Sequence, residues 1–154
     1  AILVGAGTFK NDHPSLNCRL PGMAADSPDP FVASRSLDKS DLPEHWNLLQ
    51  HAHPSEMLEV LAEAGVTRLM LEGGPKLAKA FLSANLVDRL AIFQAPFDLT
   101  FLPQTGVDAP ISPIAPMQSD LQYMGIENLP NSPSYTHIRN EICGPDVVKF
   151  FQRI

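Results

Sequence analysis

The sequence predicts an α/β fold in which helices flank a mixed central sheet and an antiparallel hairpin closes the C-terminal end. Between residues 54 and 93, apolar runs of strand length alternate with segments of helical period. Near the C-terminus, Gly144-Pro145-Asp146 separates two strand-like segments instead. A chain of 154 residues is long enough to bury one core, so we expect a single domain over residues 1–154.

The first expected strand is the apolar run Ala1–Gly5, and we expect a glycine-rich turn, Gly5-Ala6-Gly7-Thr8, directly after it. This turn lacks the third glycine of the dinucleotide-binding fingerprint. It is not a Walker loop either, since no Gly-Lys-Ser/Thr follows it.

Residues 20–54 are rich in Pro, Asp and Ser and hold only short apolar pieces such as Phe31-Val32-Ala33. We expect this stretch to be irregular or incomplete, because long structureless segments are uncommon in compact domains.

Regular structure returns with a helix over residues 54–64, which Gly65 ends. A buried strand follows at Thr67–Leu71, then a helix over 75–84 and another strand over 88–93. Short links in this order predict right-handed crossovers and a parallel sheet.

The C-terminal third is expected to differ in kind. Recurring prolines predict a surface loop without regular structure between residues 98 and 120. Residues 121–127 and 134–142 are predicted strands, and 147–151 is predicted to return along 134–142 as a hairpin.

The most informative segment is Glu72-Gly73-Gly74-Pro75, which joins the strand at 67–71 to the helix at 75–84. Unpaired N–H groups at a helix start, with the positive end of the helix dipole, make an anion site. Pro75 suits the first helical position, and Lys76 and Lys79 add positive charge. The segment therefore predicts a phosphate site, with a plain tight turn as the alternative that stays open.

Composition excludes several classes of function. The formal charge of −6 and the pI near 5.2 argue against nucleic-acid binding. The longest apolar runs are too short to span a bilayer. Cys18 and Cys143 are isolated, so we expect no cysteine-based zinc site and no other metal, and a reducing, cytoplasmic location.

Taken together, the glycine segments resemble the reductase domain of the bifunctional riboflavin-biosynthesis deaminase/reductase family. The residues that carry the resemblance are Ala1–Thr8, Asp12–Leu16 with Arg19, Leu71–Pro75, Leu86–Leu90 and Gly144–Val147.

The resemblance implies a dihydrofolate-reductase-like fold. It also implies an NADPH-dependent reduction of 5-amino-6-ribosylaminouracil 5′-phosphate, in which the ribosyl group becomes ribityl. By position, the implied substrate contacts are Leu16, Arg19 and Glu72, and Glu72 is a weak candidate for proton transfer. The implied cofactor contacts are Thr8, Asp12, Gly74, Pro75, Lys76 and Leu77.

The chain also departs from the family pattern. His13 follows Asp12 where the family has a second acid, and we expect His13 to be a solvated loop residue. The family's first strand has no counterpart here, and no deaminase motif occurs, so we expect any deaminase domain to precede this piece. The hairpin edge offers a surface for a homodimer.

Two other functions stay open at this point. One is a reductase of the same fold that acts on a pterin or another small heterocycle. The other is a non-catalytic binding remnant that has kept the fold.

Overall fold

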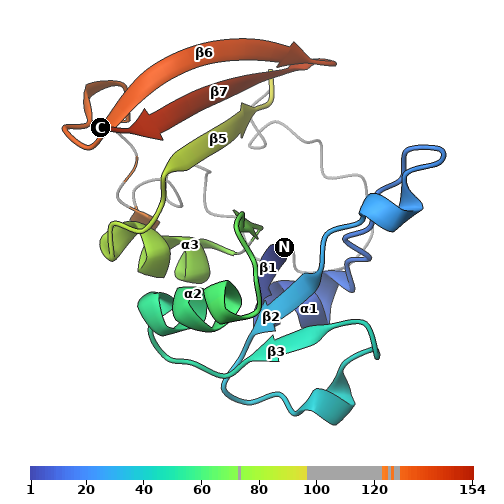
Figure 1. The fold of residues 1–154 in the computed structure, drawn as a ribbon. Coiled ribbons are helices and arrows are strands. Elements are labelled where there is room, and N and C mark those ends of the chain that lie inside the picture. The colour runs from blue at the N-terminus through green and yellow to red at the C-terminus, as the bar shows by residue number, and fades with distance from the viewer. Residues whose placement is uncertain (73, 97–122, 125, 127–128) are drawn as a thin grey trace, which may run out of the picture. The chain divides into compact units, whose positions relative to one another are not determined.

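The computed structural model describes residues 1–72, 74–96, 123–124, 126 and 129–154. Their contacts divide the chain into two compact units, Ala1–Leu86 and Val87–Ile154 (Figure 1). That residues 1–154 act as one reductase domain stays a prediction.

The first unit is built on a parallel sheet of four strands (Figure 1). Its strands are β1 (Ile2–Gly5), β2 (Pro30–Ala33), β3 (Asn47–Leu49) and β4 (Met70–Leu71). Their order across the sheet is β3-β2-β1-β4. The chain therefore runs outward from β1 through β2 to β3, then returns to pair β4 with the other side of β1.

The core of this unit forms around the inner strands. Ile2, Leu3 and Val4 are buried in succession, as expected for a strand of a parallel sheet whose two faces are both covered. One apolar cluster, which we call the Trp46 cluster, consists of Val4, Phe9, Val32, Leu37, Leu42 and Trp46. The rings of Phe9 and Trp46 meet edge to face there, with centroids 4.9 Å apart.

The prediction for residues 20–54 was wrong, since this stretch supplies β2 and β3 as well as two short 3₁₀ helices, η1 (Ala24–Asp26) and η2 (Lys39–Asp41). The strands have only four and three residues, too few to give a pattern among so many prolines and acids. Pairing with the buried β1 stabilises β2, and β2 in turn carries β3.

The turn expected after the first strand is a helix, α1 (Ala6–Asp12). One glycine and several polar residues give this segment a poor intrinsic propensity for helix. Burial of Phe9 in the Trp46 cluster outweighs that propensity.

The two predicted helices are confirmed as α2 (Pro54–Glu63) and α3 (Pro75–Ser83), each with proline in its first turn. Both end in the same hydrogen-bonded cap. Gly65 and Asn85 adopt φ of 83° and 55°. The next N–H groups, of Val66 and Leu86, donate to the carbonyls of Leu61 and Phe81.

The strand expected at Thr67–Leu71 is shorter and more exposed than predicted. Only Met70 and Leu71 are extended as β4, and Met70 is 57% exposed. Because β4 pairs only with β1 in the part of the chain that is described, it lies at an edge of its sheet.

The second unit holds an antiparallel sheet in the order β5-β7-β6 (Figure 1). Its strands are β5 (Arg89–Gln94), β6 (Tyr135–Cys143) and β7 (Asp146–Arg153), and a 3₁₀ helix, η4, covers Leu129–Asn131. The predicted hairpin is confirmed as β6 and β7, which pair from Tyr135–Arg153 to Cys143–Asp146. Gly144 has φ of 61°, which suits the first residue of a two-residue hairpin turn.

The α/β fold class is confirmed, with a parallel sheet, helices and a C-terminal antiparallel sheet. The strand predicted at 88–93 exists as β5, but it pairs antiparallel with β7 and does not extend the parallel sheet. Tyr123 and Met124 are helical, against the strand predicted at 121–127. The proline loop predicted at 98–120 lies outside the described residues.

Candidate functional site

The two glycine segments, which follow β1 and β4, meet at the carboxyl ends of these two strands. β1 and β4 run in the same direction, and the Glu72 N–H donates to the Leu3 carbonyl at 2.9 Å. α1 begins directly after β1, and α3 begins shortly after β4. A Cβ atom built on Gly74 would lie 4.0 Å from Thr8 Oγ1, and one built on Gly5 would lie 4.0 Å from Leu77 Cβ. The starts of the two helices are therefore neighbours.

The carboxyl ends of β1 and β4 also mark the topological switch point of the sheet. β2 and β3 extend the sheet on one side of β1, whereas β4 pairs with the other side. In open parallel sheets, ligands bind outside the carboxyl ends of the strands at the point where the strand order reverses. That rule selects the place where Thr8 and Gly74 face each other.

The start of α3 leaves one backbone donor without a described partner. Gly74 is its N-cap, with φ of −60° and ψ of 168°, and Pro75 opens the helix. The Leu77 and Ala78 N–H groups donate to the Gly74 carbonyl, whereas the Lys76 N–H has no partner among the described residues. Since any residue adopts the Gly74 conformation, the backbone alone does not require glycine at this position. Its missing side chain leaves space in front of the helix start.

Glu72 precedes Gly74, the N-cap of this helix, by two residues. Its backbone continues β4 at the carboxyl edge, and its side chain is exposed without a hydrogen bond or ion pair to any described residue. Lys76 is also exposed, on the first turn of α3. An acidic and a basic side chain thus lie on either side of the helix start in the sequence. Gly73, which follows Glu72, lies outside the described residues.

Asp12 lies at the opposite end of α1 from Thr8. A helix rises about 1.5 Å per residue and has about 3.6 residues per turn, so the two residues are roughly one turn, or ~6 Å, apart along the axis. The Asp12 side chain is exposed and unpaired with any described residue. The structure therefore does not bring Asp12 to the start of α1.

Leu16 and Arg19 lie in the irregular segment that follows α1. Leu16 is half-buried and packs against the Trp46 cluster. Arg19 is exposed, and its guanidinium makes no hydrogen bond or ion pair within the described ranges. The guanidinium is therefore available to an external anion, while the Leu16 side chain faces the protein interior.

Sequence reasoning missed the end of β2, which lies beside the end of β1 because Ala33 pairs with Gly5. Ser34 follows and is 8% exposed, and its Oγ accepts hydrogen bonds from the N–H groups of Ser36 and Leu37 at 3.2 and 3.1 Å. Arg35, between them, is exposed and has no partner in the described part of the chain. The available signal was Ser-Arg-Ser directly after the short apolar run Phe31–Ala33.

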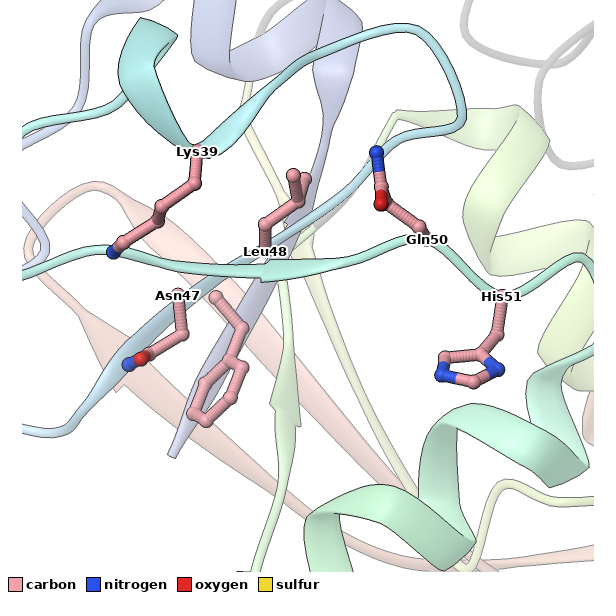
Figure 2. A pocket seen from close by; sticks show the side chains of 6 residues that line it. Lys39, Asn47, Leu48, Gln50 and His51 are labelled. Carbon is pink, nitrogen blue, oxygen red and sulfur yellow. The ribbon is translucent and has the colours of Figure 1, made fainter.

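A cavity of about 490 Å³ lies elsewhere, along the edge strand β3 (Figure 2). Asn47 and His51 lie on one side of the strand in Figure 2, and Leu48 and Gln50 on the other. The polar groups here already have partners: Lys39 Nζ donates to the Trp46 carbonyl, Gln50 Nε2 to the Leu37 carbonyl at 2.9 Å, and His51 Nδ1 is 3.8 Å from Glu56 Oε2. We therefore place the candidate site at the carboxyl ends of β1 and β4.

No cluster of three or more His, Cys, Asp or Glu side chains suited to a metal ion occurs among the residues described. Nor does any helix in those ranges have the length and apolar character needed to cross a bilayer.

Comparison with known proteins gives consistent matches. The family model described as the RibD C-terminal domain matches residues 1–99. The riboflavin biosynthesis protein RibD of Mycobacterium tuberculosis is 31% identical over 157 residues, which cover 96% of this chain and 41% of that protein. The chain thus spans about two fifths of the length of this curated relative.

Solved structures match across nearly the whole chain. RibD of Acinetobacter baumannii superposes with a TM-score of 0.65 at 16% identity, covering 100% of this chain and 47% of that one. A diaminohydroxyphosphoribosylaminopyrimidine deaminase/5-amino-6-(5-phosphoribosylamino)uracil reductase of Thermotoga maritima gives 0.63 at 19% identity, covering 99% of this chain and 45% of that one. At these identities the structures establish the fold alone.

Proposed function

Because the chain belongs to the RibD C-terminal domain family, we propose that it is an NADPH-dependent reductase of riboflavin biosynthesis. The proposed reaction reduces the ribosyl group of 5-amino-6-ribosylaminouracil 5′-phosphate to the ribityl form. One observation carries this proposal: two glycine-capped helices begin side by side at the switch point of the parallel sheet.

The residues at this switch point fit a dinucleotide phosphate. In our proposal the start of α3, from Gly74 through Pro75 and Lys76 to Leu77, holds the pyrophosphate, because the Lys76 N–H and the helix dipole both favour an anion. Thr8 faces Gly74 and lines the same place.

We propose that the end of β2 binds the adenosine 2′-phosphate. The Ser34 hydroxyl holds the turn, and the exposed Arg35 guanidinium is free to pair with a phosphate. No acid occupies this strand end, where an acid would favour the 2′-hydroxyl of NADH. Asp12 stays a proposed cofactor contact from the resemblance alone.

On the substrate side, we propose that Arg19 pairs with the 5′-phosphate, because its planar fork matches phosphate oxygens. Glu72 would accept hydrogen bonds from the ribose hydroxyls at the carboxyl end of β4. NADPH, when bound, supplies the hydride for C1 of the opened sugar. The chain's own part is to hold substrate and cofactor in line and close together.

The family also supports four proposals about context. We propose that residues 1–154 act as one reductase domain and as a homodimer. We further propose that the protein acts in the cytoplasm and that its native form carries a zinc deaminase domain. The T. maritima protein is named for both activities, which supports the last of these.

The direct test of the cofactor site replaces Gly74 by Val. The free protein should keep its fold, because the Gly74 backbone has an ordinary φ and a Cβ atom there meets Thr8 Oγ1 only at van der Waals distance. NADPH affinity should fall by about tenfold or more, since the added methyl groups occupy the space above the helix start. Fluorescence titration with NADPH measures the dissociation constant, and thermal unfolding checks the fold. An unchanged dissociation constant would place the pyrophosphate elsewhere.

A further inference from the structure

The segment from His13 to Arg19 combines backbone strain with an anchored side chain. Within four residues, His13 and Leu16 both adopt left-handed conformations, with φ of 44° and 47°. For L-residues other than glycine this conformation is unfavourable, and leucine has no polar group to compensate. Pro14 follows His13 and further limits the conformations open to it.

Four contacts hold this segment in place. The rings of His13 and Phe9 meet edge to face, with centroids 6.5 Å apart. The His13 N–H donates to the Phe9 carbonyl at 3.2 Å, at the end of α1. At the other end, the Cys18 N–H donates to Ser27 Oγ at 3.0 Å, and Ser27 Oγ donates to the Ala24 carbonyl at 2.7 Å. Between these, the Leu16 side chain packs against the Trp46 cluster.

Leu16 is the residue of this segment whose aliphatic side chain packs against the Trp46 cluster. Ser15 and Asn17, on either side of it, are exposed, and so is Arg19. Strained backbone persists only where the surroundings over-determine it, and such strain gathers at preorganised binding sites. Here, packing of the Leu16 side chain against the Trp46 cluster helps to hold the backbone in its strained conformation.

We propose that Leu16 is a positioning residue that anchors the strained segment and thereby presents the Arg19 guanidinium to the substrate phosphate. The inference rests on the proposed phosphate role of Arg19. It assigns Leu16 a role through Arg19, in place of the direct substrate contact that the sequence resemblance implies. An anchored segment places the guanidinium before the ligand arrives and so lowers the cost of ordering on binding.

The first test measures the segment without ligand. Leu16→Gly removes the anchor but accepts a φ of 47° without strain, so the variant should fold. Amide hydrogen exchange over residues 13–19 should become about tenfold faster than in the unsubstituted chain. Leu16→Met, which keeps an apolar side chain of similar volume, should restore slow exchange. Leu20→Gly is the matched control, because Leu20 is 62% exposed. Unchanged exchange in Leu16→Gly would overturn the anchor.

The second test asks whether Leu16 acts through Arg19, with ribose 5-phosphate as the probe and its dissociation constant measured by calorimetry or NMR titration. Leu16→Gly and Arg19→Ala should each raise that constant by about tenfold. In the Arg19→Ala background, Leu16→Gly should add less than about a further twofold, because the two residues act as one unit.

Additive losses would show that Leu16 touches the ligand directly and would overturn the positioning role. If Arg19→Ala alone left the constant unchanged, the proposed phosphate site would fail, and the exchange experiment would still decide the anchor.

Discussion

Glu72 is the side chain on which the proposed substrate site depends most. Its N–H is fixed on the Leu3 carbonyl, and its carboxylate is exposed beside the start of α3. Glu72→Gln keeps the shape and weakens a charge-assisted hydrogen bond. If Glu72 only binds the ribose hydroxyls, KM for the substrate should rise by about tenfold with kcat nearly intact.

A fall of kcat by about 100-fold would instead assign proton transfer to Glu72. NADPH affinity should stay within about threefold in either case, because the backbone at Gly74–Lys76 is untouched. Glu63→Gln, at an exposed acid on the last turn of α2, is the matched control. Normal kinetics in Glu72→Gln would show that Glu72 takes part neither in substrate binding nor in proton transfer.

Tyr135 gives the second unit a dependence on pH. Its hydroxyl donates to the Val87 carbonyl at 2.9 Å, and the residue is 8% exposed. Burial raises the pKa of Tyr135 above its usual 10.0; Arg153 opposes this rise and Asp88 adds to it. Above that ordinary value the unfolded chain releases the phenolic proton while the folded chain still holds it, so stability falls as pH rises.

We therefore expect the free energy of unfolding to decline above about pH 10, and to decline less in Tyr135→Phe. At neutral pH the variant should lose about 1 kcal/mol, because the Val87 carbonyl loses its donor. Urea unfolding of both proteins across this pH range measures the two effects. Parallel curves at all pH values would rule out the linkage.

Single residues of the candidate site were predictable to different degrees. Thr8 and Gly74 follow strands that run parallel, so their meeting at one edge follows from the sequence pattern. Leu16 gave no such signal, because an apolar side chain does not reveal a left-handed backbone. The inward packing of Leu16 depends on the Trp46 cluster, which includes residues distant in sequence.

At the level of elements, the ends of helices are set by local chemistry. Gly65 takes φ of 83° to close α2, and a side chain there is strained whatever the space. Gly65→Ala should therefore destabilise the chain by about 1–2 kcal/mol. Gly7→Ala is the opposite case: Gly7 lies within α1, its Cβ would meet nothing within 4 Å, and stability should rise by about 0.5–1 kcal/mol. Urea midpoints for the two variants should move in opposite directions, and equal shifts would refute this account.

The elements that the sequence indicated share a physical feature. α2 and α3 have proline starts, apolar stripes and left-handed caps, all of which are local. β2 and β3 have no such signals, since tertiary pairing with β1 determines them. The antiparallel pairing of β5 with β7 also joins segments that are far apart in the sequence. The spacing of helices and strands along the chain does not predict it.

At the scale of the whole chain, the strand order β3-β2-β1-β4 brings the two glycine segments together at the candidate site. Had β4 been added beyond β3, the starts of α1 and α3 would lie at opposite sides of the sheet. The return of the chain to β1 brings them together and creates the switch point. The net charge of −6 is compatible with an anion site, because helix starts and basic side chains act locally.

The central claim is that the chain transfers a hydride from NADPH to a phosphorylated ribosylaminouracil. The most direct measurement incubates the protein with NADPH deuterated at the transferred position and with 5-amino-6-ribosylaminouracil 5′-phosphate, and examines the product by mass spectrometry. We expect NADPH oxidation that requires this substrate, and a ribityl product with one deuterium at C1, and we expect Gly74→Val to slow both. A pterin reduced in its place would identify a different reductase of the same fold. Absence of both NADPH binding and turnover would contradict the account.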